Sequence, residues 1–115
     1  MVDINKWIET YKTAWLTKKP EDIAKLFTDD ATYTTPPDGS PLVGKEAIVK
    51  WWKEKVEPSY PTFKWEPVVL TEDTAVIQGR TTYKSGNAYL NLWIITFDEN
   101  NQAKTFTEWW MNPLY

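Results

Sequence analysis

The chain has 115 residues, a formal net charge of −3 and 42% apolar residues, which together predict one globular domain over residues 1–115. It contains neither cysteine nor histidine, which excludes disulfide and thiolate chemistry, the usual acid/base residue at physiological pH and an ordinary zinc site. The basic residues are scattered and no apolar run reaches membrane-spanning length, so we expect a cytoplasmic protein that binds neither nucleic acid nor membrane.

Apolar residues at helical spacing dominate the first part of the chain. The segment 3–16 has one apolar helical face, and Asp3 is suited to be its N-cap. A short second helix is predicted over 20–27. A short strand over 29–35 follows, then a turn-rich excursion of Pro and Gly residues, and then a third helix over 45–56.

The character of the chain changes after residue 60. Four segments are rich in β-branched and aromatic residues and are separated by short polar turns, which predicts strands joined by hairpins. These segments are 62–70, 74–83, 88–97 and 103–111. Helices followed by an antiparallel meander predict an α+β fold, with three N-terminal helices packed on one face of a curved antiparallel sheet.

The predicted strand 88–97 has two apolar faces. One face carries Trp93 and Ile95, the other Leu92 and Ile94, and the helices can cover only one of them. We expect a second subunit to bury the outer face as a homodimer, because a large exposed apolar patch is a liability in a monomer. The alternative is that helix ends and loops cover it.

Two stretches of the sequence resemble a known superfamily. Residues 26–52, "LFTDDATYTTPPDGSPLVGKEAIVKWW", are similar to the central signature of the SnoaL-like, nuclear transport factor 2-like superfamily. Residues 97–111, "FDENNQAKTFTEWWM", are similar to its last hairpin. The resemblance implies a cone of three helices against a strongly bent sheet, with an internal pocket and homodimers through the outer sheet face. It implies no single activity, because this fold hosts enzymes and non-catalytic binders alike.

Within the superfamily, ketosteroid isomerases offer the motif comparison. Their "DDAT" stretch matches Asp29 to Thr32, and by that alignment their helix-one tyrosine falls at Tyr11, which is retained. Their catalytic aspartate falls at Thr35 and their hydrogen-bond-donating acid at Trp93. Both acids are therefore missing, and we do not expect isomerase activity of that kind. Dehydratase chemistry that depends on histidine is disfavoured as well.

The same alignment suggests which side chains face the pocket. If Trp93 points inward, alternation along the strands places Glu108 inside and assigns Gln78 and Arg80 to the pocket face of their own strand. We therefore predict a catalytic set of Glu108, Arg80 and Tyr11, and a substrate-binding set of Trp15, Gln78, Asn91, Trp93, Phe106 and Trp110.

The predicted pocket carboxylate has two interpretations. Glu108 could be a general acid or base, with Arg80 and Tyr11 orienting a polar substrate. Alternatively, Glu108 and Arg80 form an internal ion pair, since an unpaired buried charge is costly.

Two functions therefore stay open. One is a cofactor-free acid/base enzyme of isomerase, cyclase or dehydratase type, acting on an apolar oxygenated substrate. The other is a non-catalytic ligand-binding or structural dimer with a pocket filled by tryptophan side chains. A protein-interaction module is a third possibility, for which nothing in the sequence marks a groove. We expect no metal and no cofactor.

Overall fold

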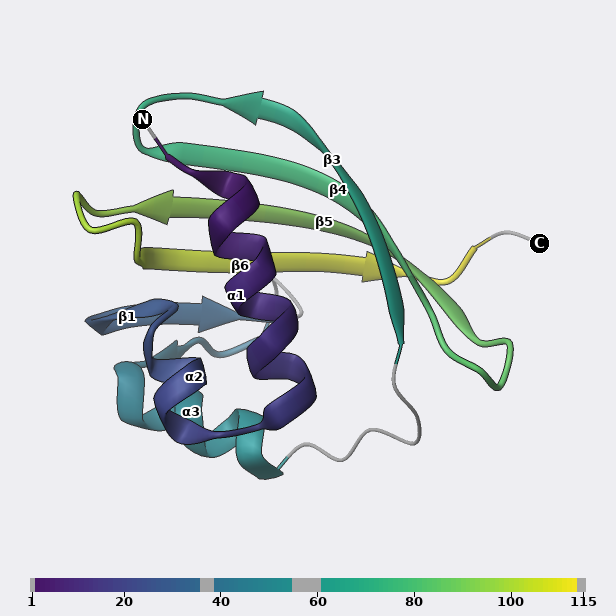
Figure 1. Cartoon of the computed structure of the whole chain (residues 1–115), viewed down its shortest axis with the longest axis horizontal. Helices are drawn as coiled ribbons and strands as arrows, with labels where there is room; N and C mark the ends of the chain where they lie inside the picture. The colour runs from purple at the N-terminus through teal and green to yellow at the C-terminus, as the bar shows by residue number, and fades with distance from the viewer. Residues whose placement is uncertain (1, 36–38, 55–60, 114–115) are drawn as a thin grey trace.

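The computed structural model describes residues 2–35, 39–54 and 61–113, and has the predicted α+β architecture (Figure 1). In the described residues, the helices are α1 (Ile4–Thr17), α2 (Pro20–Ala24) and α3 (Lys45–Glu54). The strands are β1 (Phe27–Thr34), β2 (Leu42–Val43), β3 (Thr62–Leu70), β4 (Thr74–Thr82), β5 (Ala88–Phe97) and β6 (Ala103–Met111). None of these helices has the length and apolar character needed to cross a membrane.

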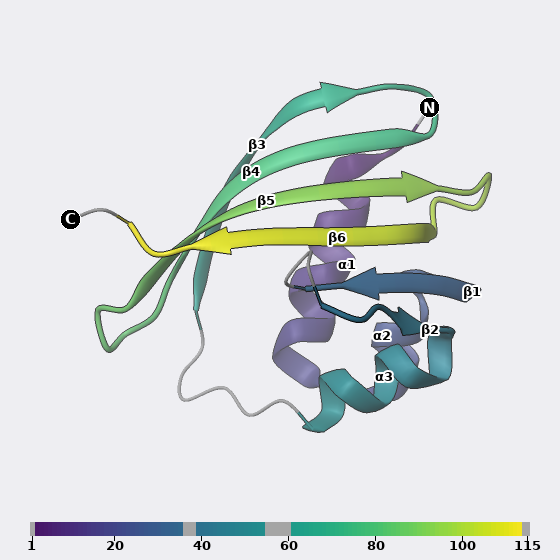
Figure 2. The same ribbon diagram turned by 180° about the vertical axis from the view of Figure 1, so that it is seen from behind.

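The strands form one curved sheet in the order β2-β1-β6-β5-β4-β3. Strands β1 and β6 pair in parallel, whereas the other neighbouring pairs are antiparallel. Figures 1 and 2 show the sheet curling around α1, so that the helices lie on its concave side. The order of elements follows the predicted meander. The short strand β2 was not predicted and lies in the excursion between β1 and α3.

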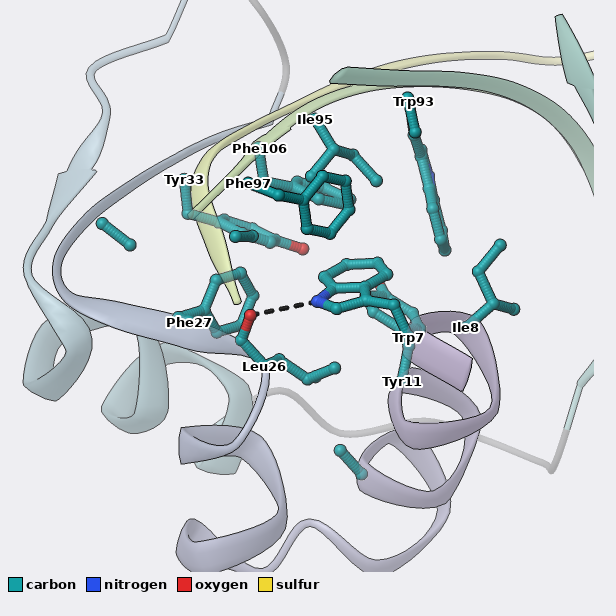
Figure 3. Close-up of a cluster of buried hydrophobic side chains, with 14 of the residues drawn as sticks. Trp7, Ile8, Tyr11, Leu26, Phe27, Tyr33, Trp93, Ile95, Phe97 and Phe106 are labelled. Atoms are coloured by element: carbon teal, nitrogen blue, oxygen red, sulfur yellow. Dashed lines mark hydrogen bonds between the residues drawn. The ribbon is translucent and has the colours of Figure 1, made fainter. Parts of the chain in front are cut away.

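Helix α1 begins as its sequence predicts. The Asp3 side chain accepts a hydrogen bond from the backbone N–H of Lys6 at 3.1 Å, which satisfies one of the open donors of the first turn. The apolar face that follows packs against the sheet. Trp7 is 2% exposed, and its indole N–H donates to the Leu26 carbonyl oxygen at 3.1 Å (Figure 3).

Helix α2 is shorter than the predicted segment 20–27, because Phe27 opens strand β1 instead. The Leu26 carbonyl accepts the backbone N–H of Ala103 at 2.7 Å in addition to the indole of Trp7. This carbonyl is therefore committed to β6 and to the core, and not to a further helical turn. The Phe27 ring is fully buried and meets Trp7 edge to face.

The pairing of β4 with β5 corrects one predicted face. Side chains directly opposite each other in a sheet share a face, and Ile77 pairs with Trp93 whereas Arg80 pairs with Leu90. The inner face of β4 therefore carries Ala75, Ile77, Gly79 and Thr81. Gln78 and Arg80 lie on the outer face, so the predicted placement of both in the pocket is wrong.

Candidate functional site

A cavity of about 400 Å³ lies between the helices and the concave face of the sheet. Helices α1 and α3 supply one wall, and strands β1, β4, β5 and β6 with the β4–β5 hairpin supply the other. Its lining is mainly aromatic and comprises the rings of Tyr11, Trp15, Tyr33, Trp51, Trp52, Tyr83, Tyr89, Trp93 and Trp110. The tryptophans thus line the space without filling it.

Glu108 brings a half-buried carboxylate to this cavity from the inner face of β6. Its Oε2 accepts the side-chain amide N–H of Asn91 at 2.8 Å and the indole N–H of Trp93 at 2.9 Å. Its Oε1 accepts the Thr35 hydroxyl at a longer 3.2 Å. All three donors are neutral, and none of the ion pairs between described residues involves Glu108. The carboxylate is therefore oriented by dipoles and not by a cation.

Thr81, on strand β4, fixes the orientation of the Asn91 side-chain amide that donates to Glu108. It is the buried polar residue of the described core, 3% exposed, and its hydroxyl donates to Asn91 Oδ1 at 2.9 Å. Because the Asn91 oxygen is occupied in this way, its amide nitrogen faces Glu108. The three residues form a directed chain in which each proton points toward the carboxylate.

Tyr33 places a hydroxyl group on the β1 side of the cavity. The residue is 3% exposed, and its ring stacks on Phe106 with centroids 4.8 Å apart. Burial, together with the negative charge of Glu108, raises the pKa of the Tyr33 hydroxyl well above its ordinary value near 10.0. Nearby Tyr11 and Trp52 favour the phenolate, but they do not offset the burial. Tyr33 is therefore a neutral hydrogen-bond donor at physiological pH.

Trp52 adds a buried donor from helix α3. The residue is 3% exposed, and its indole N–H lies beside the Tyr33 hydroxyl, near enough to favour the phenolate but without the geometry of a regular hydrogen bond to a described residue. A buried donor with a poorly aligned partner can also donate to a ligand or water oxygen, so its place in the wall of a cavity suits ligand binding.

Most of the predicted site residues meet at this cavity. Its lining includes Tyr11, Trp15, Asn91, Trp93, Glu108 and Trp110. Phe106 lies behind the wall in the core, at 1% exposure, and stacks beneath Tyr33. It supports the site without lining it.

Arg80 and Gln78 are the two predicted site residues that the structure separates from the others. Arg80 is exposed on the outer sheet face, so the predicted ion pair with Glu108 on the inner face is wrong. Gln78 donates to Glu66 on the same outer face, close to a groove that also includes Trp109. Arg80 therefore neither activates nor neutralises Glu108.

Three residues of the site were missed in the sequence, and the sequence did not separate a fourth, Trp52, from its neighbour. Thr35 was noted only as the residue at the position of an expected aspartate. Tyr33 lies two positions before Thr35, so alternation along an extended chain would put both side chains on the same face. Thr81 follows once the face of β4 is known. Trp52 sits on a helix with an adjacent tryptophan, and spacing alone does not distinguish the two.

The fold is shared with several solved structures. An NTF-2 like protein from Burkholderia xenovorans LB400 matches with a TM-score of 0.75 at 15% identity, covering 97% of this chain and 85% of that one. A ketosteroid isomerase-like protein from Erwinia carotovora atroseptica matches with a TM-score of 0.67 at 18% identity, covering 96% and 95%. The epoxide hydrolase/cyclase-like enzyme SalBIII, which has a role in pyran ring formation in the polyether salinomycin, matches with a TM-score of 0.71 at 14% identity, covering 96% and 95%.

These identities are low, so the likeness establishes the nuclear transport factor 2-like fold and not an activity. No curated protein matched the chain. The model of the SnoaL-like domain matches residues 8–109, which includes every described element except the first turn of α1 and the end of β6. The chain therefore belongs to the SnoaL-like domain family.

Proposed function

We propose that this protein binds an apolar, oxygen-bearing small molecule in the cavity and uses Glu108 as a general base and acid, without a cofactor. The observation that carries the proposal is a carboxylate held in an aromatic cavity by three neutral donors. Pockets of this kind, mostly apolar with a few convergent polar groups, are where small molecules bind. The cyclase-like and isomerase-like structural neighbours support this class of chemistry.

The two oxygens of Glu108 have different roles in this proposal. Oε2 accepts two short hydrogen bonds from Asn91 and Trp93, which leave it little capacity for a further partner. Oε1 accepts only the longer bond from Thr35 among the hydrogen bonds between described residues. Oε1 is therefore the atom that takes a proton from substrate carbon or oxygen, and the same atom returns the proton elsewhere on the product.

The donors beside helix α3 act on the developing negative charge. When Glu108 removes a proton, charge moves onto an oxygen of the substrate, and a preorganised donor stabilises it. Tyr33 is a neutral hydroxyl because its pKa is raised, and Trp52 presents a buried N–H beside it. Tyr11 lines the same space. The site thus combines a base on the sheet with donors on β1 and the helices, which suits isomerisation, cyclisation or dehydration.

A proton-exchange assay tests the base directly. The probe is 1-tetralone in D₂O, whose acidic C–H protons exchange when a base removes them, and proton NMR follows the exchange rate. We expect the wild type to accelerate exchange and Glu108→Gln to lose about 10²–10⁴-fold of that acceleration. Gln keeps the size of the side chain and can still accept from Asn91 and Trp93, so the variant should bind the probe.

The alternative is a non-catalytic binder. If Glu108→Gln binds 1-tetralone and exchanges it as fast as the wild type does, the assignment of Glu108 as base is wrong. A pocket that stabilises ligands in a thermal-shift screen while no probe exchanges would favour binding alone. The open cavity speaks against a pocket filled by Trp15, Trp52, Trp93 and Trp110.

We also propose that the protein is a homodimer through the outer sheet face. Apolar side chains stand exposed there from three strands: Val69 at 46%, Ile94 at 38%, Trp109 at 55% and Met111 at 53%. Sedimentation should give a mass near twice 13.5 kDa for the wild type. Trp109→Glu should give the monomer mass, whereas Leu16→Glu, exposed on α1, should leave the mass unchanged. A monomeric wild type at micromolar concentration would contradict this proposal.

A further inference from the structure

Gly79 lies in the middle of strand β4, where a glycine weakens a sheet unless a neighbouring group needs the space of the missing side chain. Its backbone does not require glycine, since the described glycines in the left-handed region are Gly44 and Gly86. A Cβ atom on Gly79 would lie 2.6 Å from both Cε1 and Cζ of Phe63, and 3.1 Å from the Lys64 carbonyl oxygen. The ring of Phe63 therefore occupies the space that a side chain at position 79 would need.

Phe63 uses this space to reach across a strand. It pairs with Thr81, and Trp93 pairs with Ile77, so both aromatic rings lie on the inner face of the sheet. Strand β4 separates β3, which carries Phe63, from β5, which carries Trp93, so the two backbones are roughly 10 Å apart. The rings nevertheless stack with centroids 4.8 Å apart and planes 14° apart. They meet over β4, which the absence of a side chain at position 79 permits.

This stack orients the indole of Trp93. Tyr11 and Phe106 also meet that ring, but at 47° and 58°, whereas Phe63 lies nearly flat on it. In a close-packed interior, a ring that lies flat on an indole leaves it little room to rotate. The same indole donates its N–H to Glu108 Oε2 at 2.9 Å. Phe63 is 7% exposed and does not line the cavity, so its effect on the carboxylate passes through Trp93.

We propose that Phe63 is a positioning residue for Glu108, because it holds the Trp93 N–H on Oε2. Gly79 is part of the same device, since it admits the Phe63 ring. This inference rests on the proposed function, in which Glu108 Oε1 exchanges a proton with the substrate. While Asn91 and Trp93 both hold Oε2, the carboxylate cannot turn freely and Oε1 keeps its direction. If the indole shifts, one donor remains and Oε1 is misplaced, which slows proton transfer without weakening substrate binding.

A purely structural role for Phe63 makes a different prediction. If the ring only fills the core, its removal lowers global stability, and all buried N–H groups then exchange faster with solvent through global unfolding. The indole N–H of Trp7 is an internal reference, because it is also buried and donates to the Leu26 carbonyl oxygen at 3.1 Å. Loosening of the stack accelerates exchange at Trp93 and not at Trp7. The ratio of the two exchange rates therefore separates the two roles.

The experiment follows both indole protons by NMR after transfer into D₂O, each assigned as the signal missing from the corresponding Trp→Phe variant. We expect Phe63→Leu and Gly79→Ala each to raise the ratio of the Trp93 rate to the Trp7 rate about tenfold. Trp65→Leu removes another ring of β3 that packs on the core, and as the matched control it should leave the ratio unchanged. In Phe63→Leu, the exchange of saturating 1-tetralone should fall about tenfold while its affinity stays the same.

The double variant Phe63→Leu with Gly79→Ala tests the link between the two positions. Once the ring is gone, alanine should raise the ratio no further, apart from the effect of its contact with the Lys64 carbonyl. Additive effects would contradict the role of Gly79. An unchanged ratio in Phe63→Leu, or a raised ratio with unchanged exchange of 1-tetralone, would overturn the positioning proposal. A wild type that does not exchange 1-tetralone would overturn the proposed function and the positioning role that rests on it, whereas a raised ratio would still show that Phe63 holds Trp93.

Discussion

The two faces of the sheet are formed by the same strands but place their side chains in opposite environments. On the inner face of β5, Trp93 is 1% exposed and its N–H is bonded to Glu108, whereas Trp109 on the outer face of β6 is 55% exposed. A hydrogen-bonded polar group is enclosed among the apolar side chains of the inner face, whereas several apolar side chains are exposed on the outer face. Adjacent residues of one strand thus have unrelated environments, and residue type alone does not reveal which face is the functional one.

The largest expected effect separates two tryptophans across this sheet. Trp93→Ala removes a ring that stacks on Phe63 with centroids 4.8 Å apart and deletes one donor to Glu108. We expect a loss of about 3–5 kcal/mol in the free energy of unfolding, measured by urea denaturation. Trp109→Ala is the control, and at concentrations where the protein is monomeric it should change stability by less than about 0.5 kcal/mol. Equal losses in the two variants would mean that the faces are assigned wrongly.

A smaller effect separates two neighbouring threonines. Thr81 is buried and donates to Asn91, whereas Thr82 is exposed on the outer face. Thr81→Val keeps the shape but removes the hydrogen bond, so we expect a loss of about 1 kcal/mol in stability and slower exchange of 1-tetralone by the wild-type base. Thr82→Val should change neither. If Thr81→Val were silent in both measurements, Thr81 would not orient Asn91.

Much of the fold could be predicted from the sequence, and the part that could not depends on contacts between strands that are distant in the sequence. The bounds of β3, β5 and β6 agree with the predicted segments 62–70, 88–97 and 103–111, because long runs of β-branched and aromatic residues end at polar turns. The face of β4 was predicted wrongly. Three consecutive residues, Ala75, Val76 and Ile77, are apolar, so the alternation of polar and apolar residues does not show which face of β4 points inward. The pairing with β5 determines that face, and this pairing cannot be read from the sequence of β4 alone.

The candidate site was predicted in part for the same reason. The alignment that placed Trp93 inward also placed Glu108 and Asn91, which occupy adjacent strands of the meander in simple register. The expectation that a buried carboxylate needs a cation then selected Arg80. Neutral donors from two segments, β5 and the residue after β1, hold Glu108 instead, and their convergence depends on the curvature of the sheet and on the parallel pairing of β1 with β6.

The smallest effect at neutral pH concerns Tyr33, and it appears only in alkali. Because burial and the charge of Glu108 raise its folded-state pKa above the ordinary value near 10.0, the unfolded chain loses this proton first as pH rises. The contribution of Tyr33 to stability is therefore complete below pH 10 and declines above it. Tyr33→Phe, which retains the ring stacked on Phe106, should show a shallower loss of unfolding free energy between about pH 9 and pH 11. Tyr89→Phe, at the same cavity, is the control with a half-buried ring. Identical alkaline slopes for the wild type and Tyr33→Phe would mean that Tyr33 is not the enclosed neutral donor on which the inner face depends.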